Sequence, residues 1–279
     1  VLQDNVRRAQ FYANLIRHIS FDYDLKSQVD QNSWHSVLRP LKFPQLNLVW
    51  LWETERSADL NTEDVVLHYT SPKLHTLIAT CGPLSSHFFD KWSEICSSLR
   101  DVTLSPTEVT ASTSSVVCAL HRMTNVYSLN LGKGFRKAIS SGMLEAIASC
   151  PKLEQISLSD VPEECVSALC GSRKKTWFPR LKYLYIGATA VTLELFHQIV
   201  PDLEAIGLSN EHLGRTNDIL AVASRFRQLE SVYVLLSASS TVRGDELLQI
   251  AQCCSGLEKL QIGLESWPRT MPLATGITD

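Results

Sequence analysis

Ala-Ser-Cys-Pro-Lys-Leu-Glu-Gln-Ile-Ser-Leu, at positions 148–158, is the stretch that decides the fold. Its apolar residues Leu153, Ile156 and Leu158 follow the order apolar, two variable residues, apolar, one variable residue, apolar. The last two alternate with a variable residue, which is the period of a short strand with one buried face. Positions 252–262, Gln-Cys-Cys-Ser-Gly-Leu-Glu-Lys-Leu-Gln-Ile, repeat the phrase. Two copies so far apart indicate a repeated structural unit.

The phrase recurs along the whole chain, and we call its three apolar positions the anchors. The first anchors of ten copies span positions 16 to 257, so the intervals average about 27 residues. Ala79 is the one anchor that is not a large apolar residue. The first anchors are Ile16, Leu46, Leu74, Leu99, Val126, Leu153, Leu181, Leu203, Leu229 and Leu257.

Helical patterns separate the copies. Apolar residues recur on one helical face in segments such as 86–96, 143–150, 193–200, 218–226 and 245–254. Proline cannot continue a helix, so it ends the helix and begins the turn into the next strand. It precedes the first anchor by two residues in five copies, at Pro44, Pro72, Pro151, Pro179 and Pro201. Strands that alternate with helices predict parallel strands joined by crossovers.

Over about residues 12 to 265, the chain resembles leucine-rich repeat proteins, whose repeats have periods of about 20–29 residues. The resemblance implies an α/β solenoid of about ten repeats, shaped as a curved horseshoe. Parallel strands would line the concave face and helices the convex face. We therefore expect residues 1–279 to form a single solenoid.

Three copies also carry a cysteine three residues before the first anchor, at Cys96, Cys150 and Cys254. This phrase resembles the cysteine-containing repeats of intracellular F-box/leucine-rich repeat proteins, and the irregular repeat lengths resemble divergent fungal members. The resemblance implies the substrate-recognition region of an F-box-type ubiquitin-ligase (SCF) adaptor. Partners would then be a protein substrate on the concave face and Skp1/cullin, bound through an F-box that this chain does not contain.

A second interpretation stays open, which is another intracellular binding or regulatory scaffold of the inhibitor, immune-receptor or GTPase-regulator type. The polar Asn or Cys that usually follows each repeat strand is missing, so the turns must be satisfied differently. Solenoids need polar caps at both ends. The chain starts in a helical pattern and ends in Gly-Ile-Thr-Asp, so we expect the native protein to be longer.

Composition narrows the compartment and the partners. The net charge of −3 and the isoelectric point near 6.3 argue against broad nucleic-acid binding. No apolar run is long enough to cross a membrane, so we expect no membrane association. The eight cysteines form no C-x-x-C pair, and the chain has no N-x-S/T sequon. These features favour a cytoplasmic or nuclear protein with free thiols, and we expect it to be a monomer.

Residues between the anchors should face solvent on the concave side. Aromatic residues gather there in two groups, and exposed aromatics on strands are typical of binding hot spots. They could also stack only with their strand neighbours. The residues predicted to bind a protein partner are Trp50, Trp52, Ile78, Tyr183, Tyr185 and Tyr233.

The sequence shows no catalytic constellation. The eight histidines are scattered, no G-x-S-x-G or H-E-x-x-H motif occurs, and no metal-ligand spacing is present. Two basic segments, 132–137 and 173–175, are better explained as a turn and a solvated loop than as phosphate sites. We therefore predict a protein-interaction module that is not an enzyme and needs no cofactor or metal.

Overall fold

The structure is a computed structural model that describes residues 2–22, 37–52, 63–95, 97–172, 176–209, 217–236 and 244–264. The chain divides into two compact units, unit 1 (Val1–Leu181) and unit 2 (Lys182–Asp279), and each is described by itself. The prediction of one solenoid over residues 1–279 stays a prediction.

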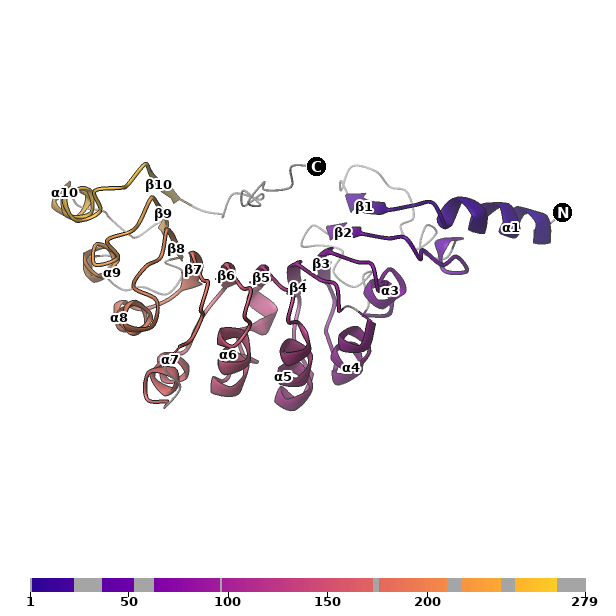
Figure 1. Cartoon of the computed structure of the whole chain (residues 1–279), viewed down its shortest axis with the longest axis horizontal. Helices are drawn as coiled ribbons and strands as arrows, with labels where there is room; N and C mark the ends of the chain where they lie inside the picture. Colours follow the sequence, from indigo (N-terminus) through magenta and orange to yellow (C-terminus); the bar gives the residue numbers. More distant parts are fainter. Residues whose placement is uncertain are drawn as a thin grey trace. The chain divides into compact units, whose positions relative to one another are not determined.

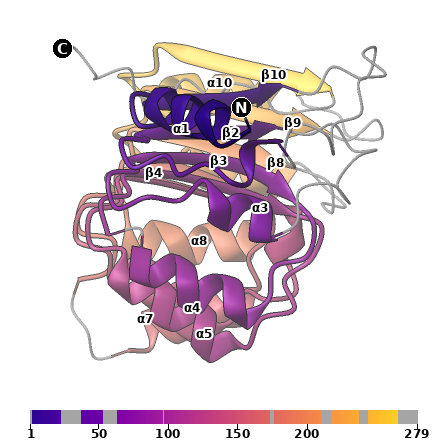
Figure 2. The same cartoon turned by 90° about the vertical axis from the view of Figure 1, so that its right-hand side faces the viewer.

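Unit 1 alternates strands and helices along the chain (Figure 1). Its strands are β1 (His18–Asp22), β2 (Leu48–Trp52), β3 (Thr76–Cys81), β4 (Asp101–Pro106), β5 (Ser128–Leu131) and β6 (Gln155–Leu158). Its helices are α1 (Leu2–Ala13), α3 (Glu63–His68), α4 (Ser86–Ile95), α5 (Thr113–Arg122), the short 3-10 helix η1 (Lys133–Phe135), α6 (Ser141–Ala148) and α7 (Glu163–Cys170). Figure 2 shows α3, α4 and α5 on the same side of β2, β3 and β4.

Unit 2 continues the same alternation. Its strands are β7 (Tyr183–Gly187), β8 (Ala205–Ser209), β9 (Ser231–Leu236) and β10 (Lys259–Leu264). Its helices are α8 (Ala190–Ile199), α9 (Asn217–Ala223) and α10 (Gly244–Cys253), which lie on one side of these strands.

Neighbouring strands pair in parallel, and the repeat sets their register. In unit 1 the second anchors of four copies are register partners in sequence order, Leu77 with Val102, Leu129 and Ile156. In unit 2 the same holds for Leu184, Ile206, Val232 and Leu260. The structure thus confirms the predicted α/β class, with parallel strands and a helix in each connection from β2 onward.

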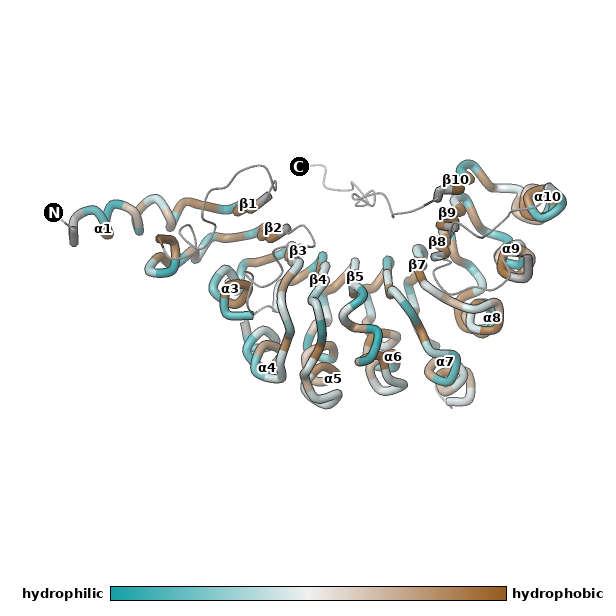
Figure 3. The backbone as a smooth tube through the Cα atoms, turned by 180° about the vertical axis from the view of Figure 1, so that it is seen from behind, coloured by the Kyte–Doolittle hydropathy of each residue, from teal (hydrophilic) through white to brown (hydrophobic). Residues whose placement is uncertain are grey.

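The anchors form the hydrophobic core. In β5 the anchors Leu129 and Leu131 are buried, while Ser128 and Asn130 between them are half-exposed. Figure 3 shows hydrophobic residues along the strands, whereas the helices carry both hydrophobic and hydrophilic residues, as expected when one helix face packs on the sheet. Ala79, the small anchor, is also fully buried.

Six anchors, all in the first and last copies of the repeat, differ from the expectation that every anchor is buried. Ile16, Ile19, Phe21 and Leu257 are half-exposed, and Leu260 and Ile262 are 39% and 37% exposed. Leu260 and Ile262 lie in β10, which pairs with β9, and among the described residues no strand pairs with its other edge. The register partners of these two anchors in β9, Val232 and Val234, are buried because β9 has neighbours on both sides.

The helix and turn signals agree with the structure. Ser112, Ser140 and Thr189 each cap a helix, because their side chains accept a hydrogen bond from the backbone N–H three residues later. The five prolines before the strands are exposed and lie in the connections between helix and strand. Backbone bonds between consecutive repeats, such as Gly132 N–H to the Leu104 carbonyl (2.8 Å), satisfy turns that lack the usual Asn.

Candidate binding surfaces

In each unit, one face of the strands is not covered by any helix that the structure describes, and we call this the open face. In strands β3 to β6 of unit 1 the open face is formed by the residues between and directly after the anchors, and they are half-exposed. Most are polar but uncharged, and the strands β3 to β6 contribute Thr76, Ile78, Thr80, Asp101, Thr103, Ser105, Ser128, Asn130, Gln155 and Ser157.

Trp50 and Ile78, both predicted to bind a partner, are neighbours on this face. They are register partners in β2 and β3, and both side chains are half-buried. The buried residues on either side of Trp50, Val49 and Leu51, show that Trp50 belongs to the open face. Trp52 ends β2 and pairs with Asp22 through the backbone, but its side chain lies outside the described residues.

The alternation of exposed and buried residues in β4 places the charged residue Asp101 on the open face of unit 1. Its half-buried carboxylate accepts a hydrogen bond from Thr76 Oγ1 on the neighbouring strand, at 3.4 Å. Burial raises the pKa of Asp101, while the Thr76 bond and the positive charge of Arg100 lower it by smaller amounts.

In unit 2 the open face carries a tyrosine pair. Tyr185 in β7 and Tyr233 in β9 are both aligned with Gly207 in the strand between them. Their ring centroids are 6.0 Å apart, although strands two positions apart are separated by roughly 9.6 Å. The rings can approach because Gly207 has no side chain to hold them apart, and Gly207 itself is buried.

This arrangement corrects the expectation that Tyr185 is exposed. Tyr185 is only 6% exposed, whereas Tyr233 is half-exposed. Burial raises the pKa of Tyr185 to about 12, with smaller contributions from Tyr233 and Tyr183. Tyr185 therefore fits the alternative interpretation, in which the aromatic residue stacks with its strand neighbours. The role of Tyr185 in partner binding stays a prediction.

Tyr183, the third predicted tyrosine, is half-exposed and lies beside carboxylates. Burial raises its pKa most, and the negative charge of Glu204 and a hydrogen bond to the same carboxylate add to the rise. The negative charge of Glu230, which directly precedes β9, also raises the pKa of Tyr183. Lys182 forms an ion pair with Glu204 at 2.8 Å.

Lysine ammonium groups lie over two tyrosine rings, that of Tyr233 in β9 and that of Tyr127 directly before β5. In unit 2 the Nζ of Lys259 lies 4.9 Å from the centroid of the Tyr233 ring, and in unit 1 that of Lys152 lies 5.9 Å from the Tyr127 ring. Such cation–π contacts show that each ring face accommodates a positive group.

A row of glutamates borders the tyrosines of unit 2, and the sequence analysis missed it. The backbone N–H of Glu204 donates to Lys182, Glu230 to Glu204 and Glu258 to Glu230, at 2.9, 2.7 and 2.8 Å. The row lies where β8, β9 and β10 begin, because each glutamate directly follows a first anchor. That fixed position in the repeat is the sequence signal that could have revealed it.

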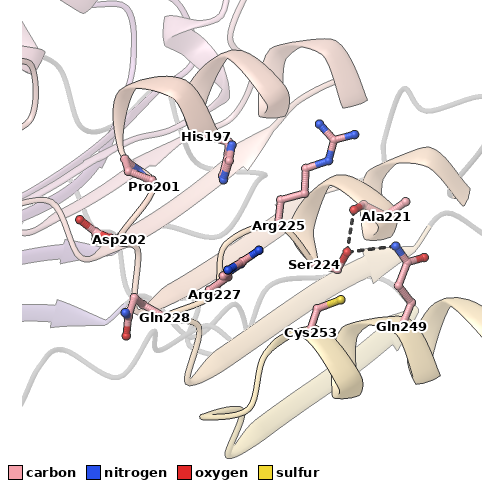
Figure 4. Close-up of a pocket in the computed structure, with 10 residues that line it drawn as sticks. All are labelled: His197, Pro201, Asp202, Ala221, Ser224, Arg225, Arg227, Gln228, Gln249 and Cys253. Carbon is pink, nitrogen blue, oxygen red and sulfur yellow. Dashed lines mark hydrogen bonds between the residues drawn. The ribbon is translucent and has the colours of Figure 1, made fainter.

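A groove of about 900 Å³ lies on the helix side of unit 2 (Figure 4). Ser224 lies between Ala221, whose carbonyl accepts its hydroxyl proton at 2.7 Å, and Gln249, whose amide donates to it at 3.2 Å. Arg225 is paired with Glu194 at 2.6 Å. The full lining is His197, Pro201, Asp202, Ala221, Ser224, Arg225, Arg227, Gln228, Gln249 and Cys253.

The charges of this groove do not select one ligand. Arg227 faces the same groove as the acidic Asp202, and Arg225 is neutralised by Glu194. The groove also lies beside the C-terminal ends of α8, α9 and α10, whose carbonyl groups disfavour an anion.

The segments weighed as phosphate sites have structural roles where they are described. A Cβ on Gly134 would collide with the Pro106 carbonyl oxygen, so this glycine lets η1 pack against β4. Trp177 and Phe178 are buried, and Trp177 Nε1 donates to the Leu169 carbonyl at 3.1 Å. Residues 173–175 lie outside the described residues.

The described cysteines are free thiols. Cys150 is buried and its Sγ lies 3.6 Å from the Ala146 carbonyl oxygen, and burial raises its pKa to about 11. Cys254 is also buried, and Cys96 lies outside the described residues. In the described part of the chain, no group of three or more potential ligands is placed to hold a metal. No described helix has the length and apolar character needed to cross a membrane.

A repeat of about 27 residues, with one parallel strand and one helix in sequence order, is the architecture of leucine-rich repeat proteins. No protein-family model matches the sequence, and no curated protein matches it. A similar solved structure is the leucine-rich repeat-containing protein LegL7 from Legionella pneumophila, with a TM-score of 0.48 and 12% sequence identity. The comparison covers 90% of this chain and 83% of that chain. The fold assignment rests on the repeat and the strand register.

Proposed function

We propose that the chain is a non-catalytic module that binds a protein partner through the open faces of its strands. The observation that carries the proposal is the half-buried aromatic and apolar side chains on faces that no described helix covers. These are Trp50 and Ile78 in unit 1, and Tyr183 and Tyr233 in unit 2. Aromatic side chains on a rigid sheet lose little conformational entropy on binding, which is why they are frequent in interfaces.

The test compares open-face variants with helix-side variants that also shorten exposed apolar side chains to alanine. The pair Trp50→Ala and Tyr233→Ala removes apolar side chains from the open faces. The matched control is Val191→Ala with Leu248→Ala, because these residues are 52% and 57% exposed on α8 and α10. Proteins that copurify with the full-length protein in its native cells are quantified for each variant.

We expect the open-face pair to lose at least one specific partner and the helix-side pair to retain it. A partner that is lost with the helix-side pair and kept with the open-face pair would place binding on the helices and contradict the proposal. Circular dichroism and thermal unfolding of each variant separate lost binding from lost folding.

A narrower proposal is that this module recognises the substrate of an F-box-type ubiquitin-ligase adaptor in the cytoplasm or nucleus. Its support is the cysteine phrase, since Cys150 and Cys254 are both buried at the turn before a strand. Cys254 Sγ lies 3.5 Å from the Phe226 carbonyl oxygen, as a structural thiol would. The proposal predicts that the full-length protein copurifies with Skp1 and a cullin. Purification without either would leave the general binding module and exclude this role.

A further inference from the structure

In unit 2 the glutamate row borders the open face, and that face carries the tyrosine rings and a cation that already lies on one ring. We propose that this surface binds an extended, arginine-rich segment of a partner protein. The inference rests on the proposed protein-binding function and specifies the chemistry of the partner. We call Tyr183, Glu204, Glu230, Tyr233 and Glu258 the tyrosine–glutamate surface.

The charges of this surface favour a positive partner. Lys182 is neutralised by its ion pair with Glu204. Glu230 and Glu258 are exposed, and within the described residues neither forms an ion pair. Lys259 is the nearby positive side chain, so two free carboxylates outweigh one ammonium group. A nucleic acid or an acidic peptide would be repelled by the same charges.

The spacing of the row suits an extended peptide. Consecutive strands are about 4.8 Å apart, so Glu204 and Glu258 are separated by roughly 10 Å across two strand steps. Alternate side chains of an extended peptide are about 6.8 Å apart. Two arginines on the same side of such a peptide are therefore closer together than the two ends of the glutamate row. Their long side chains can bridge the difference between the arginine spacing and the carboxylate spacing.

The tyrosines favour arginine over lysine. A guanidinium group is planar, stacks on aromatic rings and can form two parallel hydrogen bonds to one carboxylate. The Tyr233 ring accepts the ammonium group of Lys259 at 4.9 Å, so a cation is already accommodated at this position. A guanidinium group from a partner can replace Lys259 there. The buried Tyr185 packs against Tyr233, and this contact restricts the position of the Tyr233 ring.

The probe for this proposal is a fluorescein-labelled peptide in which arginine and serine alternate over about eight residues. Its affinity for the full-length protein is measured by fluorescence anisotropy at low and high salt. Peptides with glutamate or lysine in place of arginine are the comparison probes. We expect the arginine peptide to bind, the lysine peptide to bind several-fold more weakly, the glutamate peptide not to bind, and salt to weaken binding.

Variants locate the binding surface. Glu230→Gln with Glu258→Gln should weaken the arginine peptide about tenfold. Glu163→Gln with Glu164→Gln, on the exposed surface of α7, should leave its affinity unchanged. Lys259→Gln should strengthen binding a few-fold, because it removes the competing cation. A purely structural role of these residues would not produce an increase.

Equal binding of the arginine and glutamate peptides, or equal weakening by the two glutamine pairs, would overturn the proposal. Its failure is distinguishable from failure of the proposed function. If Trp50→Ala with Tyr233→Ala abolishes partner capture while the arginine peptide does not bind, the binding module stands and the arginine preference is wrong. If the arginine peptide binds but Trp50→Ala with Tyr233→Ala leaves partner capture unchanged, the arginine preference of the tyrosine–glutamate surface stands. The proposed capture of partners through Trp50 and Tyr233 is then wrong.

Discussion

At the scale of single residues, the open face contains side chains with different roles. Tyr185 and Tyr233 were expected to be equivalent because both lie between anchors. The period of a strand predicts on which face of the sheet a side chain lies. It does not predict how much of that side chain the neighbouring strands bury. Gly207 between the two strands decides the outcome, because it lets Tyr185 become buried against Tyr233. The alternation of each strand could be predicted from sequence, whereas the contact across strands could not.

This difference predicts unequal costs for the two tyrosines. Tyr185→Ala should lower the free energy of unfolding by about 3 kcal/mol, because it removes a buried aromatic side chain. Tyr233→Ala should cost less than half as much, since the ring is half-exposed. Urea denaturation followed by circular dichroism measures both. Equal costs would contradict the burial of Tyr185.

The raised pKa of Tyr185 predicts a loss of stability in alkali. Its pKa is about 12 in the folded protein, against 10.0 for an ordinary tyrosine. The folded state therefore holds this proton more tightly, so the stabilisation is complete below pH 10 and is lost as pH rises towards 12. Unfolding measured across this range should show a weaker pH dependence for Tyr185→Phe. Tyr69, whose pKa is also raised to about 12, should retain its own share of the pH dependence in that variant. An unchanged pH dependence would show that Tyr185 does not contribute.

At the scale of elements, the repeat predicted the helices and strands well because each anchor phrase sets one strand and each proline ends one connection. The predicted helical segment 143–150 overlaps α6 (Ser141–Ala148), and 245–254 overlaps α10 (Gly244–Cys253). The short helix η1 could not be predicted, because it depends on how closely the chain approaches β4. Gly132 and Gly134 allow this approach, and neither requires a positive φ.

This packing predicts opposite effects for two glycines. Gly134→Ala should destabilise the protein by about 1–3 kcal/mol, since the new Cβ meets the Pro106 backbone, which cannot move aside easily. Gly142→Ala is the control, because its Cβ would be 3.9 Å from Val117 Cγ2 and alanine favours helix α6. It should be neutral or stabilising by up to about 1 kcal/mol. Thermal unfolding measures the stability of both variants. A Gly134→Ala protein as stable as the unsubstituted protein would show that η1 does not pack as described.

At the scale of the whole molecule, the repeat defines the fold class but not the partner. Ten anchor phrases repeat along the sequence, whereas the functional residues lie at variable positions between them. The aromatic residues were found because they stand out by size, and the glutamate row was missed because single glutamates are common on surfaces. Its significance depends on strands that lie about 27 residues apart in sequence and side by side in space.

The central claim is that partners bind the open faces of the strands and not the helices. Site-specific photo-crosslinking in native cells tests it most directly, with benzoylphenylalanine placed singly at Thr103 or Ser231 on the open faces and at Ser114 or Gln198 on the helices. We predict that the same partner crosslinks from Thr103 or Ser231 and not from the helix positions. A partner that crosslinks only from Ser114 or Gln198 would contradict the account.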